Sequence, residues 1–125
     1  MIPELPHPSQ WLDFLKPAQE ANWYTNYGPV NTRFEERLHA LYGIEHEGVV
    51  TASNATSGLS ACLIAEHISG PVLCPAFTFQ ATAAAILGAS CRPVIMDVDA
   101  ATGVVSPKVL EDAFRKSGAR AALVL

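Results

Sequence analysis

The chain alternates between short apolar runs and longer stretches whose apolar residues recur every three to four positions. Runs that are apolar throughout are typical of strands buried on both faces of a parallel sheet. Four such runs stand at residues 49–51, 72–74, 94–96 and 123–125. Helical stretches follow the first three, at residues 57–68, 79–87 and 107–116. This alternation predicts an α/β fold, a doubly wound parallel sheet with helices on both faces and right-handed crossovers.

A further helix is predicted ahead of the alternating region. Its apolar residues form one stripe within residues 33–42: Phe34, Leu38, Leu41 and Tyr42. Thr32 and Glu35 match the Thr-x-x-Glu pattern of a capping box, and Gly43 suits the left-handed residue that follows a helix. Ser106 and Gly118 mark the start and the end of the last helix in a similar way.

Residues 1–29 are rich in proline and aromatic side chains. We expect them to form an arm that packs against another part of the protein, with a short helix at residues 10–16. At the other end, a sheet of four parallel strands with nothing after residue 125 would leave an edge uncovered. We therefore expect the chain to be the first part of a longer protein.

Composition narrows the classes of protein to consider. The 125 residues carry a formal net charge of −4 with no basic block, which favours small molecules or proteins over nucleic acid or an anionic membrane as partners. Three widely spaced cysteines, Cys62, Cys74 and Cys91, indicate neither a disulfide framework nor a zinc site. No signal-peptide pattern and no apolar run of membrane-spanning length are present. A cytoplasmic protein is expected.

The turn at residues 53–58 (SNATSG) lies between the first expected strand and a helix. Unpaired N–H groups and the positive end of the dipole at a helix N-terminus suit a phosphate dianion, and Thr56 and Ser57 add hydroxyl donors. The alternative is that Ser53, Asn54 or Thr56 only caps the helix. The turn has neither a Walker pattern nor Gly-x-Gly-x-x-Gly, which disfavours nucleoside triphosphates and dinucleotides.

A second turn, at residues 75–82 (PAFTFQAT), follows the next strand. Ligands of open α/β sheets bind outside the carboxyl ends of the strands, so this turn should lie beside the first. A planar heterocycle can stack on Phe77 or Phe79, although both rings can equally be ordinary core residues. A phosphate site beside an aromatic face suggests a site for pyridoxal phosphate.

A third polar turn contains Asp97 and Asp99. Paired carboxylates can transfer protons, whereas aspartates in this position more often end a strand and organise a turn. No metal site is expected, because the histidines show no ligand spacing: His7, His39, His46 and His67. His39 and His67 are expected on helices, in solvated positions.

Eight motifs follow one another from about residue 23 to residue 125. They are Asn26-Tyr27-Gly28-Pro29, Phe34-Glu35, Tyr42-Gly43, residues 53–59, residues 75–82, Gly88-Ala89, Pro93-Val94 and Asp97-Val98-Asp99. In order and spacing they resemble the DegT/DnrJ/StrS family of sugar aminotransferases. The resemblance implies the type I fold of pyridoxal-phosphate enzymes. It implies that Ala55, Thr56 and Ser57 hold the cofactor phosphate, largely through backbone N–H groups, and that Phe79 stacks on the pyridine ring.

The resemblance also implies a substrate and an assembly. Members of the family work as homodimers with active sites at the subunit interface, and usually transfer an amino group from glutamate to a keto sugar on a nucleotide. Gly28 and Pro29 are expected near the active site, in contact with the substrate. The chain then divides into an arm and active-site loop, residues 1–30, and the first part of the cofactor-binding large domain, residues 31–125.

The family's imine-forming lysine and the aspartate that pairs with the pyridine nitrogen lie beyond the part that this chain matches. Lys16, Lys108 and Lys116 lie in the arm or on a helix face, so no catalytic residue is assigned. Residues 1–125 alone are therefore not expected to be an active transaminase. Two alternatives remain. One is a sugar dehydratase of the same family, in which that lysine is replaced, and the other is a non-catalytic remnant or binding module.

Overall fold

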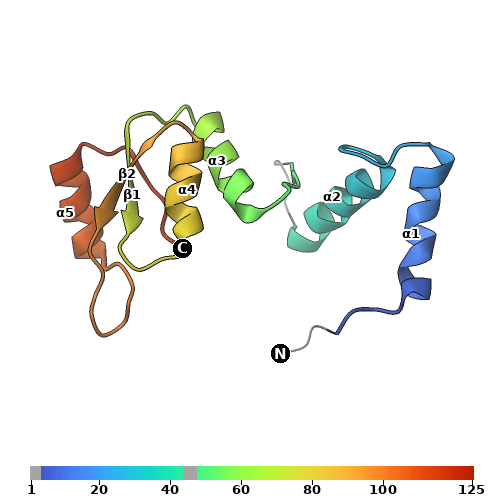
Figure 1. The fold of residues 1–125 in the computed structure, drawn as a ribbon, viewed down its shortest axis with the longest axis horizontal. Helices are drawn as coiled ribbons and strands as arrows, with labels where there is room; N and C mark the ends of the chain where they lie inside the picture. Colours follow the sequence, from blue (N-terminus) through green and yellow to red (C-terminus); the bar gives the residue numbers. More distant parts are fainter. Residues whose placement is uncertain (1–3, 44–47) are drawn as a thin grey trace. The chain divides into compact units, whose positions relative to one another are not determined.

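The computed structural model describes residues 4–43 and 48–125 (Figure 1). Its contacts divide the chain into two compact units, Met1–Thr51 and Ala52–Leu125, and each is described by itself. The expected division into an arm with the active-site loop, residues 1–30, and the first part of the large domain, residues 31–125, is based on function and stays a prediction. His46 lies outside the described residues.

The second unit is an α/β sheet with helices on both faces. Its elements are α3 (Ala55–Ala65), β1 (Pro71–Pro75), α4 (Gln80–Gly88), β2 (Arg92–Met96), α5 (Pro107–Ser117) and β3 (Ala121–Ala122). The strands are parallel in the order β2-β1-β3, with Leu73 opposite both Val94 and Ala122. The chain moves from β1 to β2 and then returns past β1 to β3. Because the direction reverses, α4 and α5 cover opposite faces, as Figure 1 shows. The α/β prediction is confirmed.

The core of this unit lies around the central strand. Val72, Leu73 and Cys74 of β1 are all fully buried, as expected for a strand covered on both faces. Ile86 of α4 and Leu63 of α3 form a core cluster with Val72 and Cys74. Burial raises the pKa of the Cys74 thiol, which keeps that side chain protonated and apolar.

The first expected strand, at residues 49–51, is not a strand in the structure. A strand needs a neighbour for its N–H and C=O groups, and residues 49–51 pair with none of the strands β2, β1 and β3. Thr51 instead donates its backbone N–H and its hydroxyl to Glu35 Oε1, over 2.7 and 2.9 Å. These hydrogen bonds hold the pKa of Glu35 below its usual value. The last strand, expected within the apolar run at the end of the chain and centred on residues 123–125, is Ala121–Ala122 in the structure.

The first unit contains two helices, α1 (Pro8–Glu20) and α2 (Pro29–Tyr42). Helix α2 begins before the expected capping box: Gly28 is its N-cap, and the Thr32 N–H donates to the Gly28 carbonyl within the helix. The box prediction was wrong, because Pro29 at the first helical position provides an earlier start. Gly43 ends α2 in the left-handed conformation, with φ of 62°, as predicted.

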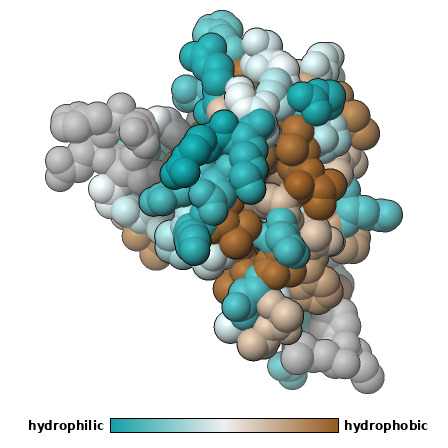
Figure 2. Space-filling view, turned by 90° about the vertical axis from the view of Figure 1, so that its left-hand side faces the viewer, coloured by the Kyte–Doolittle hydropathy of each residue, from teal (hydrophilic) through white to brown (hydrophobic). Residues whose placement is uncertain are grey.

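The surface that carries α5 has both hydrophilic and hydrophobic side chains (Figure 2). Figure 2 looks at the side of the molecule on which α5 lies, where hydrophilic side chains gather next to hydrophobic ones. Ser106 accepts the Val109 N–H at the start of α5, and Gly118 ends it with φ of 67°. Strand β2 stands at the sheet edge, where Ile95 is 62% exposed. In the part of the chain that the structure describes, no helix has the length and apolar character needed to cross a membrane.

Candidate functional site

The predicted cofactor residues lie in the second unit, at the end of the sheet where the carboxyl ends of β1 and β2 lie (Figure 1). Helix α4 starts after the carboxyl end of β1, and α3 runs alongside α4. Figure 1 shows that both helices begin at the edge where the arrows of β1 and β2 end. The third polar turn, after β2, lies at that edge as well. The second and third turns thus follow the carboxyl ends of the parallel strands β1 and β2, and the packing of α3 beside α4 places the first turn at the same end of the sheet (Figure 1).

The start of α3 has both a cap and open donors. Asn54 is the N-cap, and its Oδ1 accepts the Ser57 N–H over 2.9 Å. The first bond within the helix runs from the Gly58 N–H to the Asn54 carbonyl, at 3.1 Å. The N–H groups of Ala55 and Thr56 precede that bond and point out of the helix end. Thr56 is partly exposed and Ser57 is exposed, so their hydroxyls are accessible too. Capping by Asn54 and anion binding by the other groups are thus compatible.

The start of α4 presents an aromatic ring. Phe79 is the N-cap residue of α4, and its side chain is 74% exposed. Phe77 is equally exposed, so neither ring belongs to the core of the described residues. The Phe77 ring lies against the third turn, with Cδ1 only 3.3 Å from where a Cβ on Gly103 would stand. Phe79, on the helix start, is the ring that a ligand bound at this edge can stack on.

Asp99 organises the third turn. Its Oδ1 accepts the N–H groups of Ala101 and Thr102, over 3.0 and 2.9 Å, and the Thr102 hydroxyl over 3.0 Å. These hydrogen bonds, chiefly those from Thr102, hold the pKa of Asp99 below its usual value. Asp97 accepts the Val98 N–H over 2.9 Å. The structural interpretation of both aspartates is confirmed.

The Asp99 turn gives a pH prediction. Because its folded pKa is depressed, Asp99 stabilises the fold fully above the ordinary aspartate pKa of about 3.9, and this stabilisation is lost as the pH falls through the folded pKa. Asp99→Asn should therefore lower the unfolding midpoint at pH 6, with a smaller difference from the wild type at pH 3. Denaturant titrations at the two pH values measure this. Glu111→Gln, on the surface of α5, controls for the loss of one charge, and an equal Asp99→Asn deficit at both pH values would contradict the prediction.

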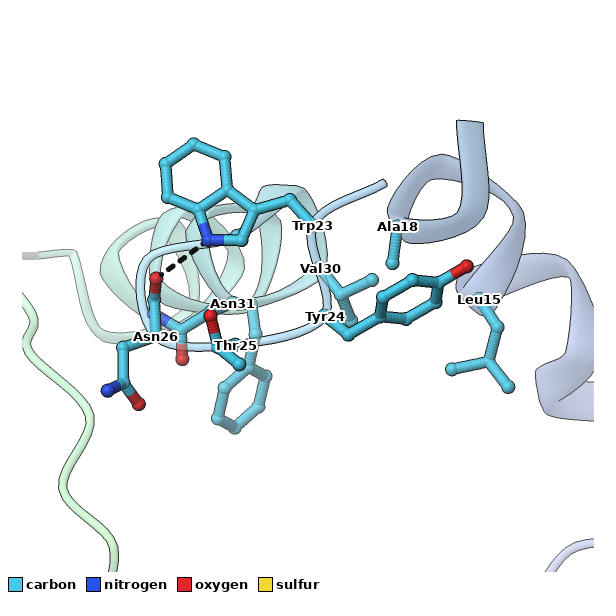
Figure 3. A pocket seen from close by; sticks show the side chains of 10 residues that line it. Leu15, Ala18, Trp23, Tyr24, Thr25, Asn26, Val30 and Asn31 are labelled. Atoms are coloured by element: carbon cyan, nitrogen blue, oxygen red, sulfur yellow. Dashed lines mark hydrogen bonds between the residues drawn. The ribbon is translucent and has the colours of Figure 1, made fainter. Parts of the chain in front are cut away.

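Gly28 and Pro29 lie in the first unit, at the start of α2. A Cβ on Gly28 would stand 2.9 Å from the Thr25 carbonyl oxygen and 3.1 Å from that of Trp23, so the loop closes tightly only around a glycine. Beside this loop is a pocket of about 450 Å³ (Figure 3). Figure 3 shows the Trp23 and Tyr24 rings pointing in different directions, with the Trp23 Nε1–H donating to the Asn26 carbonyl.

The sequence reasoning missed the contribution of Trp23 and Tyr24 to this pocket. The aromatic richness of the arm was visible, but the loop that gathers the rings depends on hydrogen bonds between residues several positions apart. The Trp23 N–H donates to the Ala18 carbonyl over 2.9 Å, and the Gly28 N–H donates to that of Thr25 over 3.1 Å. A reverse turn without a strong Gly or Pro signal at its start leaves little trace in the sequence.

The model of the DegT/DnrJ/EryC1/StrS aminotransferase family matches residues 10–124. The dTDP-4-amino-4,6-dideoxy-D-glucose transaminase of Escherichia coli is 33% identical over 97 residues, which make up 78% of this chain and 26% of the relative. The structure of DesI in the presence of its TDP-sugar product has a TM-score of 0.80 at 30% identity, over 95% of this chain and 30% of DesI.

A second solved structure, from Bacillus cereus ATCC 10987, is provisionally named a PLP-dependent aminotransferase. It has a TM-score of 0.81 at 30% identity, over 98% of this chain and 34% of that protein. The chain thus spans about a quarter to a third of the length of the proteins that it resembles.

Proposed function

The chain belongs to the DegT/DnrJ/EryC1/StrS aminotransferase family, and from this membership we propose that the complete gene product is a pyridoxal-phosphate-dependent aminotransferase. Its proposed reaction transfers an amino group from glutamate to a keto sugar carried on a nucleotide. The observation that carries the proposal is the shared edge at which α3 offers open N–H donors and α4 offers an exposed ring. A ligand with a phosphate at one end and a flat heterocycle at the other matches both.

The described residues fit pyridoxal 5'-phosphate. The N–H groups of Ala55 and Thr56, with the Thr56 and Ser57 hydroxyls, bind the phosphate, while Asn54 keeps the helix end capped. The Phe79 ring orients the pyridine ring and keeps water from one of its faces. Once bound, the cofactor supplies an electron-poor ring that stabilises negative charge on the substrate.

The substrate is assigned to the first unit. We propose that Gly28 and Pro29, with the pocket beside them, contact the nucleotide sugar. The Trp23 and Tyr24 rings offer surfaces for stacking, and Asn26 and Asn31 offer hydrogen-bonding groups. Names of relatives support this substrate class, since one is a dTDP-sugar transaminase and another was solved with a TDP-sugar.

We also propose that the protein is a homodimer in the cytoplasm. Helix α1 exposes several large apolar side chains that a partner subunit would cover: Trp11, Leu12, Phe14 and Leu15. The free thiols of Cys74 and Cys91 are buried in the core, which suits a reducing compartment.

Replacement of Phe79 tests the cofactor assignment. Phe79→Ala in the complete gene product should weaken pyridoxal-phosphate binding by about 2–10-fold, because stacking of this kind contributes about 0.5–1.5 kcal/mol. Titration of the cofactor-free protein, followed by absorbance, measures the change. Phe77→Ala removes an equally exposed ring two residues away and should stay within about twofold of the wild type. Equal losses of affinity in both variants would contradict the proposal that the cofactor ring stacks on Phe79.

The reaction needs a separate assay. The intact mass of the protein from its native source gives the length of the gene product. That product, with bound pyridoxal phosphate and glutamate, should form more than one equivalent of 2-oxoglutarate per active site only when a nucleotide-linked keto sugar is present, because the first equivalent forms when glutamate gives its amino group to the cofactor. Loss of water from the nucleotide sugar without gain of nitrogen would instead support a dehydratase.

A further inference from the structure

Ser60 joins the two helices that carry the proposed cofactor site. It lies on α3, and its Oγ stands 3.1 Å from the Thr56 carbonyl oxygen in the same helix and 2.9 Å from the Ala85 carbonyl oxygen in α4. The side chain is partly buried between the helices. One hydroxyl therefore reaches the backbone of both helices at their line of contact.

Gly88 allows this close approach from the other side. A Cβ at this position of α4 would stand 2.8 Å from Ser60 Oγ and 3.7 Å from Ser60 Cβ. At the first distance the Ser60 hydroxyl, at the end of its side chain, must move away, whereas the second is an ordinary van der Waals contact. A methyl group at Gly88 would thus displace the Ser60 hydroxyl without a clash against the rest of the serine.

The hydroxyl is not required to satisfy the carbonyl in α4. The Ala85 carbonyl already accepts the Ala89 N–H over 3.1 Å. Removing Ser60 Oγ therefore leaves no buried polar group without a partner, which is the usual cause of a large loss of stability. What the hydroxyl adds is a fixed register of one helix against the other.

That register bears directly on the site. Ser60 lies five residues after the first residue of α3, and Ala85 lies five residues after the first residue of α4. At 1.5 Å per residue the contact is about 7.5 Å from both helix starts. A shift of α3 along α4 at this contact moves the donors of Ala55 and Thr56 relative to the Phe79 ring by the same amount.

We propose that Ser60 and Gly88 are a positioning pair that sets the spacing between the phosphate-binding start of α3 and the ring-binding start of α4. The inference rests on the proposed function. It predicts that substitutions at Ser60 or Gly88 weaken the binding of ligands that contact both helix starts and do not change the binding of ligands that contact only one.

Three probes separate these cases in the complete gene product: pyridoxal phosphate, inorganic phosphate and pyridoxal. Gly88→Ala should weaken pyridoxal-phosphate binding by about threefold, because the added methyl group displaces the Ser60 hydroxyl from its position between the helices. Binding of inorganic phosphate and of pyridoxal should change by less than about twofold. Ser60→Ala, which only removes one oxygen, should weaken pyridoxal phosphate by about threefold.

The double variant tests the steric argument. In the Ser60→Ala background, Gly88→Ala places two methyl groups at an ordinary distance, so its further effect should fall below about twofold, a clear departure from additivity. Gly48→Ala and Ser69→Ala are matched controls, since a Cβ on Gly48 meets nothing within 4 Å and Ser69 lies in the exposed turn before β1. Both controls should bind all three probes as the wild type does.

Two results would overturn the positioning role. One is a Gly88→Ala variant that weakens all three probes equally, which is the sign of a general loss of structure. The other is unchanged affinity for pyridoxal phosphate in both single variants. A wild-type protein that binds no pyridoxal phosphate overturns the proposed function itself, so the two failures are distinguishable.

Discussion

Replacing Ile86 with alanine is expected to lower the free energy of unfolding by about 2–5 kcal/mol, the usual cost of truncating a large buried aliphatic side chain. Ile86 is fully buried in α4 and belongs to the core cluster with Leu63, Val72 and Cys74. The cluster joins α3, α4 and the central strand. Because the neighbours are held by three different elements, they cannot collapse easily into the cavity that the substitution leaves, which favours the upper part of that range.

The control for this prediction is Ile64→Ala. Ile64 lies on α3 but is 57% exposed, so its truncation should cost no more than about 0.5–1 kcal/mol. Chemical denaturation followed by circular dichroism compares the two variants directly. Similar losses in both would mean that the core does not centre on the face of α4 that carries Ile86. The result also concerns function, because α4 carries Phe79 at its start.

Elements with local signals could be predicted from the sequence. Strand β1 is indicated by the apolar run Val72, Leu73 and Cys74. The ends of α5 are indicated by the cap residues Ser106 and Gly118. The shared position of the second and third turns also followed, because alternation of strands and helices fixes which ends of the strands meet.

Features that depend on distant partners could not be predicted. Residues 49–51 have strand propensity, but no pattern in the sequence says that Thr51 donates to Glu35 and not to a neighbouring strand. Thr32 with Glu35 is a good capping sequence, yet Gly28 with Pro29 starts α2 earlier, and the apolar stripe is compatible with either start. The approach of Gly88 to Ser60 depends on the distance between two helices, which composition does not encode.

Within the site, the N-cap residue of α3 could not be predicted from the sequence either. Ser53, Asn54 and Thr56 all qualified as the N-cap of α3, and only the backbone conformation selects Asn54. That selection decides which groups remain for a ligand. The Ser57 N–H is used by Asn54 Oδ1, so Ser57 offers its hydroxyl, whereas Ala55 and Thr56 offer backbone N–H groups.

Ser57→Glu is expected to have opposite effects on stability and on cofactor binding. Ser57 is the third residue of α3, a position where a glutamate can accept the backbone N–H of the N-cap residue and interact favourably with the helix dipole. The free energy of unfolding should therefore stay unchanged or rise by about 0.3–1 kcal/mol. The same carboxylate repels a phosphate dianion and replaces a hydroxyl donor. Pyridoxal phosphate should bind about 100-fold more weakly, since hydrogen bonds to charged groups contribute about 1.5–3 kcal/mol.

Ser57→Gln separates charge from shape. Glutamine has the size of glutamate and can also form the capping contact, so both variants lose the serine hydroxyl and add the same bulk. The glutamine variant should lose about tenfold or less in affinity, and its gap from the glutamate variant should narrow as salt screens the added charge. Melting without the cofactor and cofactor titration at low and high salt provide the two readouts. Equal binding by the glutamate and glutamine variants would mean that no anion lies at the start of α3, whereas a gap that closes with salt supports a phosphate held there by N–H donors.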